Sequence, residues 1–263
     1  MNNNLWVWGY VLDKVPGPMM FVDHETHCSL ETGAAYLGAD NVVFMDSTTN
    51  LANLNDDLFQ YVSGCKQVVC GLEHGRYAES AAAVSEFSLT HPNVLGAIVD
   101  DFRCIGGPSD DMQPSELREV YQALKSKNPA LQLYLVRYSH QDQRELVPFL
   151  DYFDVINYWV WASSDHYWRS QYQEDVRYLR KLYGKPLLQG VFMHNYGEHT
   201  DAPIPMDMLE LQVEKIAEQL LLQRLSGWVI LQNGWFCHRS HRPQMQWLKA
   251  YLDWFYGTLT VRK

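Results

Sequence analysis

The sequence lacks the long apolar runs and the basic clusters that would tie a chain to a membrane or to nucleic acid. No apolar run reaches membrane-spanning length, and the first residues pass directly into a strand pattern, with no basic segment and apolar signal core before it. The chain has 21 Lys and Arg against 31 Asp and Glu, a net charge of -10, and no basic run. We therefore expect a cytoplasmic protein that binds neither membranes nor nucleic acid.

Cysteine is scarce as well. The five cysteines are odd in number and scattered, and no two of them have the C-x-x-C spacing. Neither a disulfide framework nor a zinc knuckle is indicated, which favours a reducing compartment.

Several catalytic signatures are also missing. There is no G-x-S-x-G, and the paired glycines Gly106 and Gly107 stand alone, without the glycine-rich loop that binds phosphate in barrel enzymes. The histidines of His24-Glu25-Thr26-His27 lack the spacing of a helical zinc motif. We expect no cofactor and no metal. One alternative left open is a metal site made of four side chains: Glu73, His74, Asp101 and His194.

A regular alternation of strand and helix patterns fills the chain. Short apolar runs rich in branched residues alternate with longer stretches that have helical spacing. The predicted strands lie in eight ranges, of which the fourth also includes the residues directly after its strand: 6–11, 41–45, 66–72, 94–103, 131–136, 154–160, 186–193 and 227–231. Eight such units in 263 residues are typical of an α/β fold, a single (β/α)8 TIM barrel that spans residues 1–263 as one domain.

The fourth of these stretches, VLGAIVDDFR, organises the rest. Its apolar run ends in two adjacent carboxylates, Asp100 and Asp101. The carboxyl ends of barrel strands carry the chemistry of such folds, whereas two neighbouring charges in a core would be costly to bury. Both acids are therefore candidate catalytic residues, although acidic pairs also cap helices or face water on ordinary loops.

The predicted barrel brings the polar and aromatic residues at its strand ends to one rim. Acids, amides and aromatic rings together suit a sugar, whose C–H faces pack on rings and whose hydroxyls need paired donors and acceptors. Most of the remaining rings, such as Trp168 and Trp247, are expected to pack in the core. The candidate substrate-binding residues are Asp46, Glu73, Arg137, Tyr138, Asn157, Trp159, Trp161, His194, Tyr196, Gln232, Asn233 and Trp235, with Asp13 at the same rim.

The motifs LGAIVDDF, INYWVW and GWVILQNGW resemble those of chitinase-like glycoside hydrolases that act on N-acetylhexosaminides. When Gly96 is aligned with the glycine of the chitinase fourth-strand signature, Phe102 falls where that family has its acidic Glu. Trp161 and Ala162 fall where it has Tyr and Asp. Adjacent carboxylates after the fourth strand are more similar to the O-GlcNAcase family. That resemblance implies that Asp100 orients the acetamido group of the substrate and that Asp101 is the general acid and base.

Glycoside cleavage usually needs one protonated acid and a second group across the anomeric carbon, either a carboxylate or the substrate's own acetamide. Two adjacent acids disfavour joint ionisation, so one tends to stay protonated. Because side chains alternate along a strand, both acids reach one substrate only if the strand ends or twists between them. We expect a glycoside hydrolase acting on 2-acetamido-2-deoxy sugars by substrate assistance. The alternatives are a two-carboxylate glycosidase for 2-hydroxy sugars, a non-catalytic carbohydrate-binding barrel, and a metal-dependent hydrolase or lyase.

Overall fold

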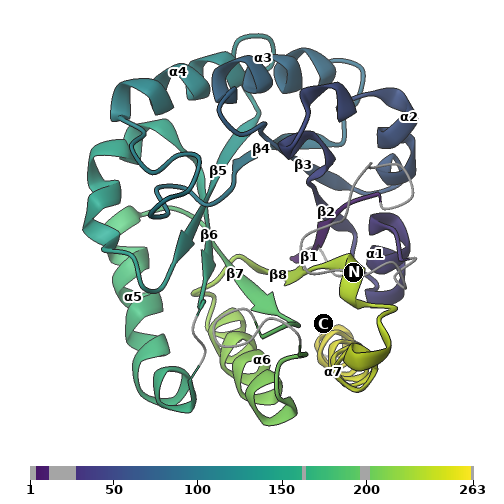
Figure 1. The fold of residues 1–263 in the computed structure, drawn as a ribbon. Helices are drawn as coiled ribbons and strands as arrows, with labels where there is room; N and C mark the ends of the chain where they lie inside the picture. Colours follow the sequence, from purple (N-terminus) through teal and green to yellow (C-terminus); the bar gives the residue numbers. More distant parts are fainter. Residues whose placement is uncertain (1–3, 12–27, 162–163, 196–201, 262–263) are drawn as a thin grey trace.

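A computed structural model describes residues 4–11, 28–161, 164–195 and 202–261, and it confirms the predicted single (β/α)8 barrel (Figure 1). Parallel strands follow one another in chain order, and β1 pairs with β8 to close the sheet. The strands are β1 (Leu5–Gly9), β2 (Asn41–Phe44), β3 (Gln67–Gly71), β4 (Val94–Val99), β5 (Gln132–Tyr138), β6 (Val155–Trp159), β7 (Leu187–Phe192) and β8 (Gly227–Leu231).

Helices surround the barrel on the outside (Figure 1). The α-helices are α1 (Leu30–Leu37), α2 (Asp56–Phe59), α3 (Tyr77–Phe87), α4 (Pro114–Leu124), α5 (Tyr172–Tyr183), α6 (Met206–Leu221) and α7 (Arg242–Val261). The 3-10 helices are η2 (Asp46–Thr48), η3 (Leu51–Asn53), η4 (Gln60–Val62), η5 (Gln143–Tyr152), η7 (Asn233–Trp235) and η8 (Arg239–His241), and η6 (Tyr167–Gln171) is a π-helix.

Large aromatic side chains fill the barrel interior. Trp6 packs against Tyr134, with 6.4 Å between ring centroids, and Trp8 meets Trp159 edge to face at 5.9 Å. The ring of Trp159 lies over Gly190 of β7, where any side chain would collide with it. The interior is therefore a packed core, and a ligand has to bind at one end of the barrel.

Two of the segments that connect strands do not form a single α-helix. The amphipathic stretch after β2 forms the short elements η3, α2 and η4 instead of one helix. The stretch after β5 is the 3-10 helix η5, which contains Pro148. Proline lacks the N–H that an α-helix needs at an interior position, and its ring crowds the preceding turn.

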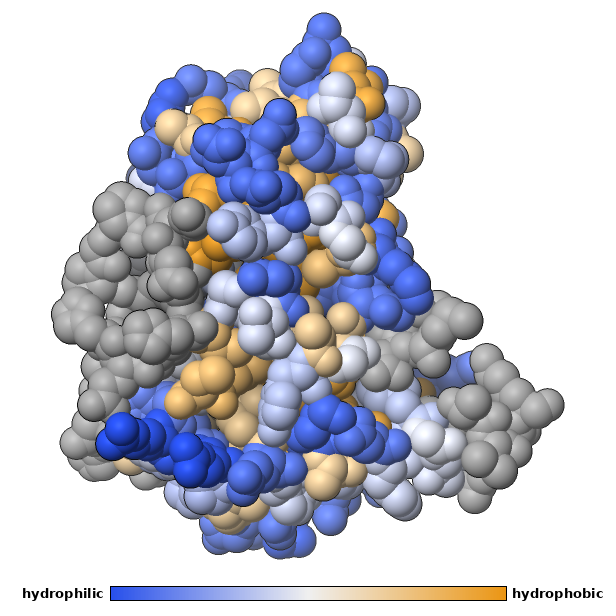
Figure 2. All heavy atoms as spheres, turned by 90° about the vertical axis from the view of Figure 1, so that its right-hand side faces the viewer, coloured by the Kyte–Doolittle hydropathy of each residue, from blue (hydrophilic) through white to orange (hydrophobic). Residues whose placement is uncertain are grey.

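The outer surface is predominantly polar on the side viewed in Figure 2. Hydrophilic residues cover most of that face, and the apolar residues form separate patches between them. None of the helices in the described part of the chain is long and apolar enough to cross a membrane.

The packing of Trp159 over Gly190 predicts a stability effect. A Cβ atom at Gly190 would lie 1.9 Å from a ring carbon of Trp159, so Gly190→Ala forces the ring or the strand to move. We expect the free energy of unfolding to fall by about 1–3 kcal/mol, as is usual for overpacking, in urea denaturation followed by circular dichroism.

Gly257→Ala is the matched control, because a Cβ at this position of α7 meets nothing within 4 Å. Alanine in a helix is more favourable than glycine, so this variant should be unchanged or gain up to about 1 kcal/mol. Equal unfolding midpoints for the two variants would contradict the packing described here.

Candidate active site

The chain turns between the two acids that follow β4. The strand ends at Val99, and Asp101 has a left-handed backbone with φ +48°. The N–H of Asp101 donates to Oδ1 of Asp100 at 2.9 Å. Regular alternation would send the two side chains to opposite faces, but this turn ends the alternation between them. Strand alternation therefore does not force the two carboxyl groups to opposite faces of the sheet.

Tyr138, at the end of β5, lies beside both acids. Its hydroxyl donates to Oδ1 of Asp101 at 2.5 Å. Burial raises the pKa of Tyr138 well above its ordinary value, and the charges of Asp100 and Asp101 raise it further. The phenol therefore stays protonated and holds one oxygen of Asp101. The other oxygen, Oδ2, accepts no hydrogen bond from any residue that the structure describes.

Burial raises the pKa of the Asp100 carboxyl well above its usual range, and the neighbouring charge of Asp101 raises it further. The hydrogen bond from the Asp101 N–H opposes this rise without cancelling it. Asp100 is therefore protonated more readily than an ordinary aspartate.

The loop that carries Asp101 is fixed by hydrogen bonds. The Ser109 hydroxyl accepts from the N–H of Arg103 at 3.1 Å and donates to the carbonyl of Asp101 at 3.2 Å. The Gln141 amide donates to the carbonyls of Phe102 and Arg103 at 3.2 and 2.8 Å. The acid pair is thus held by the β4 and β5 loops together, as a positioned catalytic group requires.

Two residues beside the pair were not among the predicted site residues. Asp101 partly offsets the lowering of the His74 pKa that burial causes, so this histidine lies within electrostatic range of the acid. Tyr77 has its pKa raised to about 12, chiefly by burial and then by the charges of Asp100 and Asp101. The sequence analysis names His74 only as a ligand of the alternative metal site, although its position directly after Glu73 at a strand end indicates a rim residue. Tyr77 is the first residue of α3, where sequence offers no such signal.

A partly exposed tryptophan stands next to Tyr138. Trp161 is 37% exposed, and its ring packs edge to face on Tyr138 at 5.6 Å and on Phe192 at 5.9 Å. Phe192 in turn contacts Trp159 at 4.9 Å. This aromatic wall extends from the barrel interior to the surface beside the acid pair, and its exposed ring offers an apolar face to a ligand.

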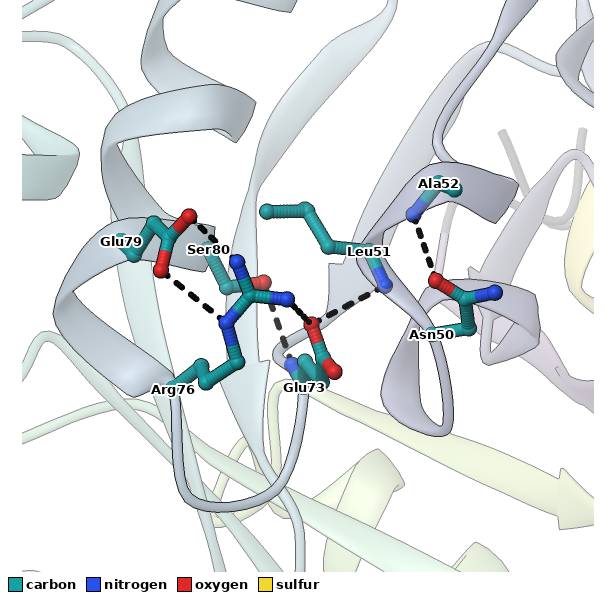
Figure 3. A network of polar contacts seen from close by, with 7 residues as sticks. All are labelled: Asn50, Leu51, Ala52, Glu73, Arg76, Glu79 and Ser80. Atoms are coloured by element: carbon teal, nitrogen blue, oxygen red, sulfur yellow. Dashed lines mark hydrogen bonds and ion pairs between the residues drawn. The ribbon is translucent and has the colours of Figure 1, made fainter.

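Glu73 anchors a loop (Figure 3). Its Oε2 accepts from the Leu51 N–H at 3.1 Å and from Nη1 of Arg76 at 3.0 Å. Its own N–H donates to the Ser80 hydroxyl, while Arg76 also pairs with Glu79. The carboxylate therefore joins the β3–α3 loop to η3, and this network fixes the backbone on one side of His74.

The structure gives Arg137 a different task from the predicted substrate contact. Its side chain is fully buried, and its two terminal nitrogens donate to the carbonyls of Phe102 at 3.0 Å and Asp142 at 3.1 Å. Because side chains alternate along a strand, Arg137 and Tyr138 point to opposite faces of β5. Arg137 therefore holds the β4 and β5 loops from behind the site.

Asp46 and Asn157 are buried at the barrel. Both oxygens of Asp46 lie within reach of the Val11 N–H, at 3.2 and 3.1 Å, and burial raises the pKa of this carboxyl to about 7. Asn157 is 1% exposed, and neither its Oδ1 nor its Nδ2 has a partner among the described residues. An unpaired buried amide is costly, so a water molecule or ligand is expected there.

The residues at β7 and β8 are mostly engaged with one another. His194 hydrogen-bonds His241 at 2.9 Å and stacks on the buried ring of Trp235 at 4.2 Å. The Asn233 amide accepts from the Tyr10 N–H at 2.9 Å and donates to the Tyr10 carbonyl at 3.0 Å, which ties β8 to β1. Gln232 is buried directly after β8. The predicted rim residues Tyr196 and Asp13 lie outside the described residues.

The alternative metal site is not assembled. Among the residues that the structure describes, no group of three or more His, Cys, Asp and Glu side chains is arranged to hold a metal ion. Glu73, one of its four proposed ligands, is instead paired with Arg76.

No protein-family model and no curated protein sequence matches the chain. Solved structures match it over almost its whole length. A protein assigned as an α-L-fucosidase from Bacteroides thetaiotaomicron has TM-score 0.62 and 11% identity, with 97% of this chain and 94% of that one covered. The endoglucanase catalytic domain of Thermobifida fusca has TM-score 0.59 and 13% identity, with 95% and 91% covered. A mutant tryptophan synthase α-subunit from Pyrococcus furiosus has TM-score 0.56 and 9% identity, with 97% and 98% covered. The TM-scores and the coverage show a shared fold.

The raised pKa of Asp46 predicts a pH dependence of stability. The folded protein keeps this proton up to about pH 7, whereas the unfolded chain releases it near 3.8. The free energy of unfolding should therefore fall as pH rises through this interval, by about 4 kcal/mol at most. Asp46→Asn stays neutral and still accepts from Val11, so it should lose less stability over the same interval.

Chemical denaturation of both proteins at about pH 4.5 and about pH 7.5 measures this difference. The stability of Asp46→Asn relative to the parent protein should increase at the higher pH. An equal difference at the two values would show that Asp46 does not carry a raised pKa.

Proposed function

We propose that this protein is a glycoside hydrolase whose catalytic groups are Asp100 and Asp101. The observation that carries the proposal is the turn after β4, which leaves two adjacent acids beside one tyrosine hydroxyl and next to the exposed ring of Trp161. A carboxyl pair can donate and accept protons at a glycosidic bond, and an aromatic ring can pack on a sugar face. Two of the solved structures with this fold are described as a fucosidase and an endoglucanase, which agrees with the proposal.

The finer form of the proposal is substrate assistance on a 2-acetamido-2-deoxy sugar, as the resemblance to O-GlcNAcases implies. The acetamide N–H of the substrate donates to Asp100, which must then be an acceptor. As this bond forms, a proton on Asp100 is transferred to its neighbour Asp101. Substrate binding thereby places this proton on the residue that acts as the acid.

The reaction then follows from these positions. The acetamide oxygen attacks the anomeric carbon while the bond to the leaving oxygen breaks, and Asp101 gives that oxygen its proton. In the second step Asp101 takes a proton from water, and the water oxygen opens the cyclised intermediate. Tyr138 holds Oδ1 of Asp101 throughout, so that Oδ2 is the oxygen that carries the proton.

A two-carboxylate mechanism on 2-hydroxy sugars needs a second carboxylate across the sugar. Glu73 is paired with Arg76, and Asp46 is fully buried behind the Val11 N–H, so neither is an open carboxylate in the structure. This observation favours the acetamide as the nucleophile.

The first test removes the acid. Asp101→Asn should leave the fold intact and lower turnover by at least about a hundredfold on an aryl glycoside with a poor leaving group, because the departing oxygen then receives no proton. The loss should be smaller for a good leaving group such as 2,4-dinitrophenolate. Steady-state kinetics with both substrates and a circular dichroism spectrum check the prediction.

Asp111→Asn provides the control, since it makes the same change at an exposed position of the same loop and should keep full activity. Asp100→Asn should lose turnover on both leaving groups alike, because an acetamide-orienting residue acts on the nucleophile. Near-normal activity of Asp101→Asn on the poor leaving group would mean that another residue is the acid, and Glu73 would be examined next.

The second test concerns the nucleophile. If it is the acetamide, aryl 2-acetamido-2-deoxyglycosides should be cleaved and the matching 2-hydroxy sugars should not. A thiazoline mimic of the cyclised intermediate should inhibit strongly, because it resembles the high-energy species. Both sugar series are assayed with and without chelator.

Cleavage of the 2-hydroxy series without an acetamido requirement would support the two-carboxylate mechanism instead. Sensitivity to chelator would support a metal-dependent enzyme. Measurable sugar binding with no cleavage of either series would rule out a hydrolase and leave a carbohydrate-binding barrel.

A further inference from the structure

A second candidate site lies at the opposite end of the barrel from Asp101. A cavity of about 300 Å³ opens where α5 ends and where β7 and β8 begin. Three basic side chains line it, Arg180, Lys185 and Arg224, together with Ser226. The amino ends of parallel strands lie opposite the rim that carries the acid pair, so this cavity is separate from the proposed active site.

The three positive charges have only uncharged partners. Nη1 of Arg180 donates to the carbonyl of Gln223, and Nη1 of Arg224 donates to Oε1 of Gln219 at 3.2 Å. Nζ of Lys185 lies 5.3 Å from the ring centroid of Phe153. Within the described part of the chain none of the three is within ion-pair distance of a carboxylate.

Another basic residue of α5, outside the cavity, does have a carboxylate partner. Arg177, one turn before Arg180, pairs with Glu174. The charges around the cavity are therefore uncompensated even though the chain as a whole carries a net charge of -10. A local excess of positive charge on an acidic protein attracts an anion.

The helix dipoles of α5 and α6 neutralise only part of the positive charge around the cavity. The carboxyl ends of α5 and α6 approach the cavity through Gly184 and Gln223, and each helix end carries roughly half a negative charge. Three full positive charges against two such ends leave roughly two positive charges. This excess matches a doubly charged anion.

We propose that this cavity binds a small phosphate monoester. The planar guanidinium groups of Arg180 and Arg224 can each pair with two phosphate oxygens, which an ammonium group does less well. Lys185 adds a third charge, and the Ser226 hydroxyl lines the same cavity. A cavity of about 300 Å³ has room for an organic part beside the phosphate, comparable to the small end of ligand pockets.

Isothermal titration calorimetry on the full chain tests the site with three probes: a hexose 6-phosphate, inorganic phosphate and the unphosphorylated hexose. The hexose phosphate should bind in a 1:1 ratio, more tightly than inorganic phosphate, and the hexose should not bind. Affinity should fall with added salt, because the attraction is between charges at a partly exposed site. Arg180→Gln and Arg224→Gln should each weaken binding at least about tenfold, the equivalent of one charge-assisted contact.

Lys181→Gln is the matched control, since it removes an exposed charge from the next position of α5 without lining the cavity. Asp101→Asn should bind the hexose phosphate as the parent protein does, which keeps this test independent of the proposed hydrolase. Thermal melts show whether each variant is folded. Absence of saturable binding to the folded parent protein, or equal weakening by Lys181→Gln, would overturn the site. Equal affinity for inorganic phosphate and the ester would overturn the choice of ligand.

Discussion

Closure of the sheet between β1 and β8 is the constraint on which the rest of the structure depends. Leu5 to Trp8 pair in register with Trp228 to Leu231, and the Asn233 amide then fixes the β8 turn to the Tyr10 backbone. Gly9 has to be a glycine at this point, because a Cβ atom there would overlap the Asn233 side chain. Once the ring is closed, all strand ends of one polarity share one rim. Asp101 after β4 can then meet Tyr138 at the end of β5, and Tyr138 packs on Trp161 after β6.

The rim residues form two groups according to what their side chains contact. Glu73, Arg137 and Asn233 bond to backbone atoms and hold loops in place. Asp100 and Asp101 follow β4 side by side, and the Tyr138 hydroxyl donates to Asp101. Of the first group, Arg137 holds the loop that carries the acids. In that fixed position burial raises the pKa of Asp100, and the neighbouring charge of Asp101 raises it further.

The sequence predicted the architecture because strand and helix periodicity repeats along the chain. Each predicted strand overlaps an observed one, and Gly227–Leu231 agrees at both ends. The site was harder to predict, because a strand end does not reveal which of two neighbours faces inward. Arg137 and Tyr138 are equally polar candidates in sequence, yet one faces the loops and the other the acids. The left-handed backbone of Asp101 could not be predicted either, because an aspartate adopts this conformation only occasionally.

Asn157 is a buried amide whose presence carries a cost in folding stability. Its neighbours in the sheet register are Val136 and Leu188, and both polar atoms of its buried side chain lack partners among the described residues. An apolar residue of similar volume would avoid the desolvation cost of about 1–3 kcal/mol for each unpaired group. Folding alone therefore does not account for an amide at this position. Asn157 lies two positions before Trp159 on β6, so its side chain shares the inward face of the strand. An enclosed water molecule that pairs with the amide would offset this cost.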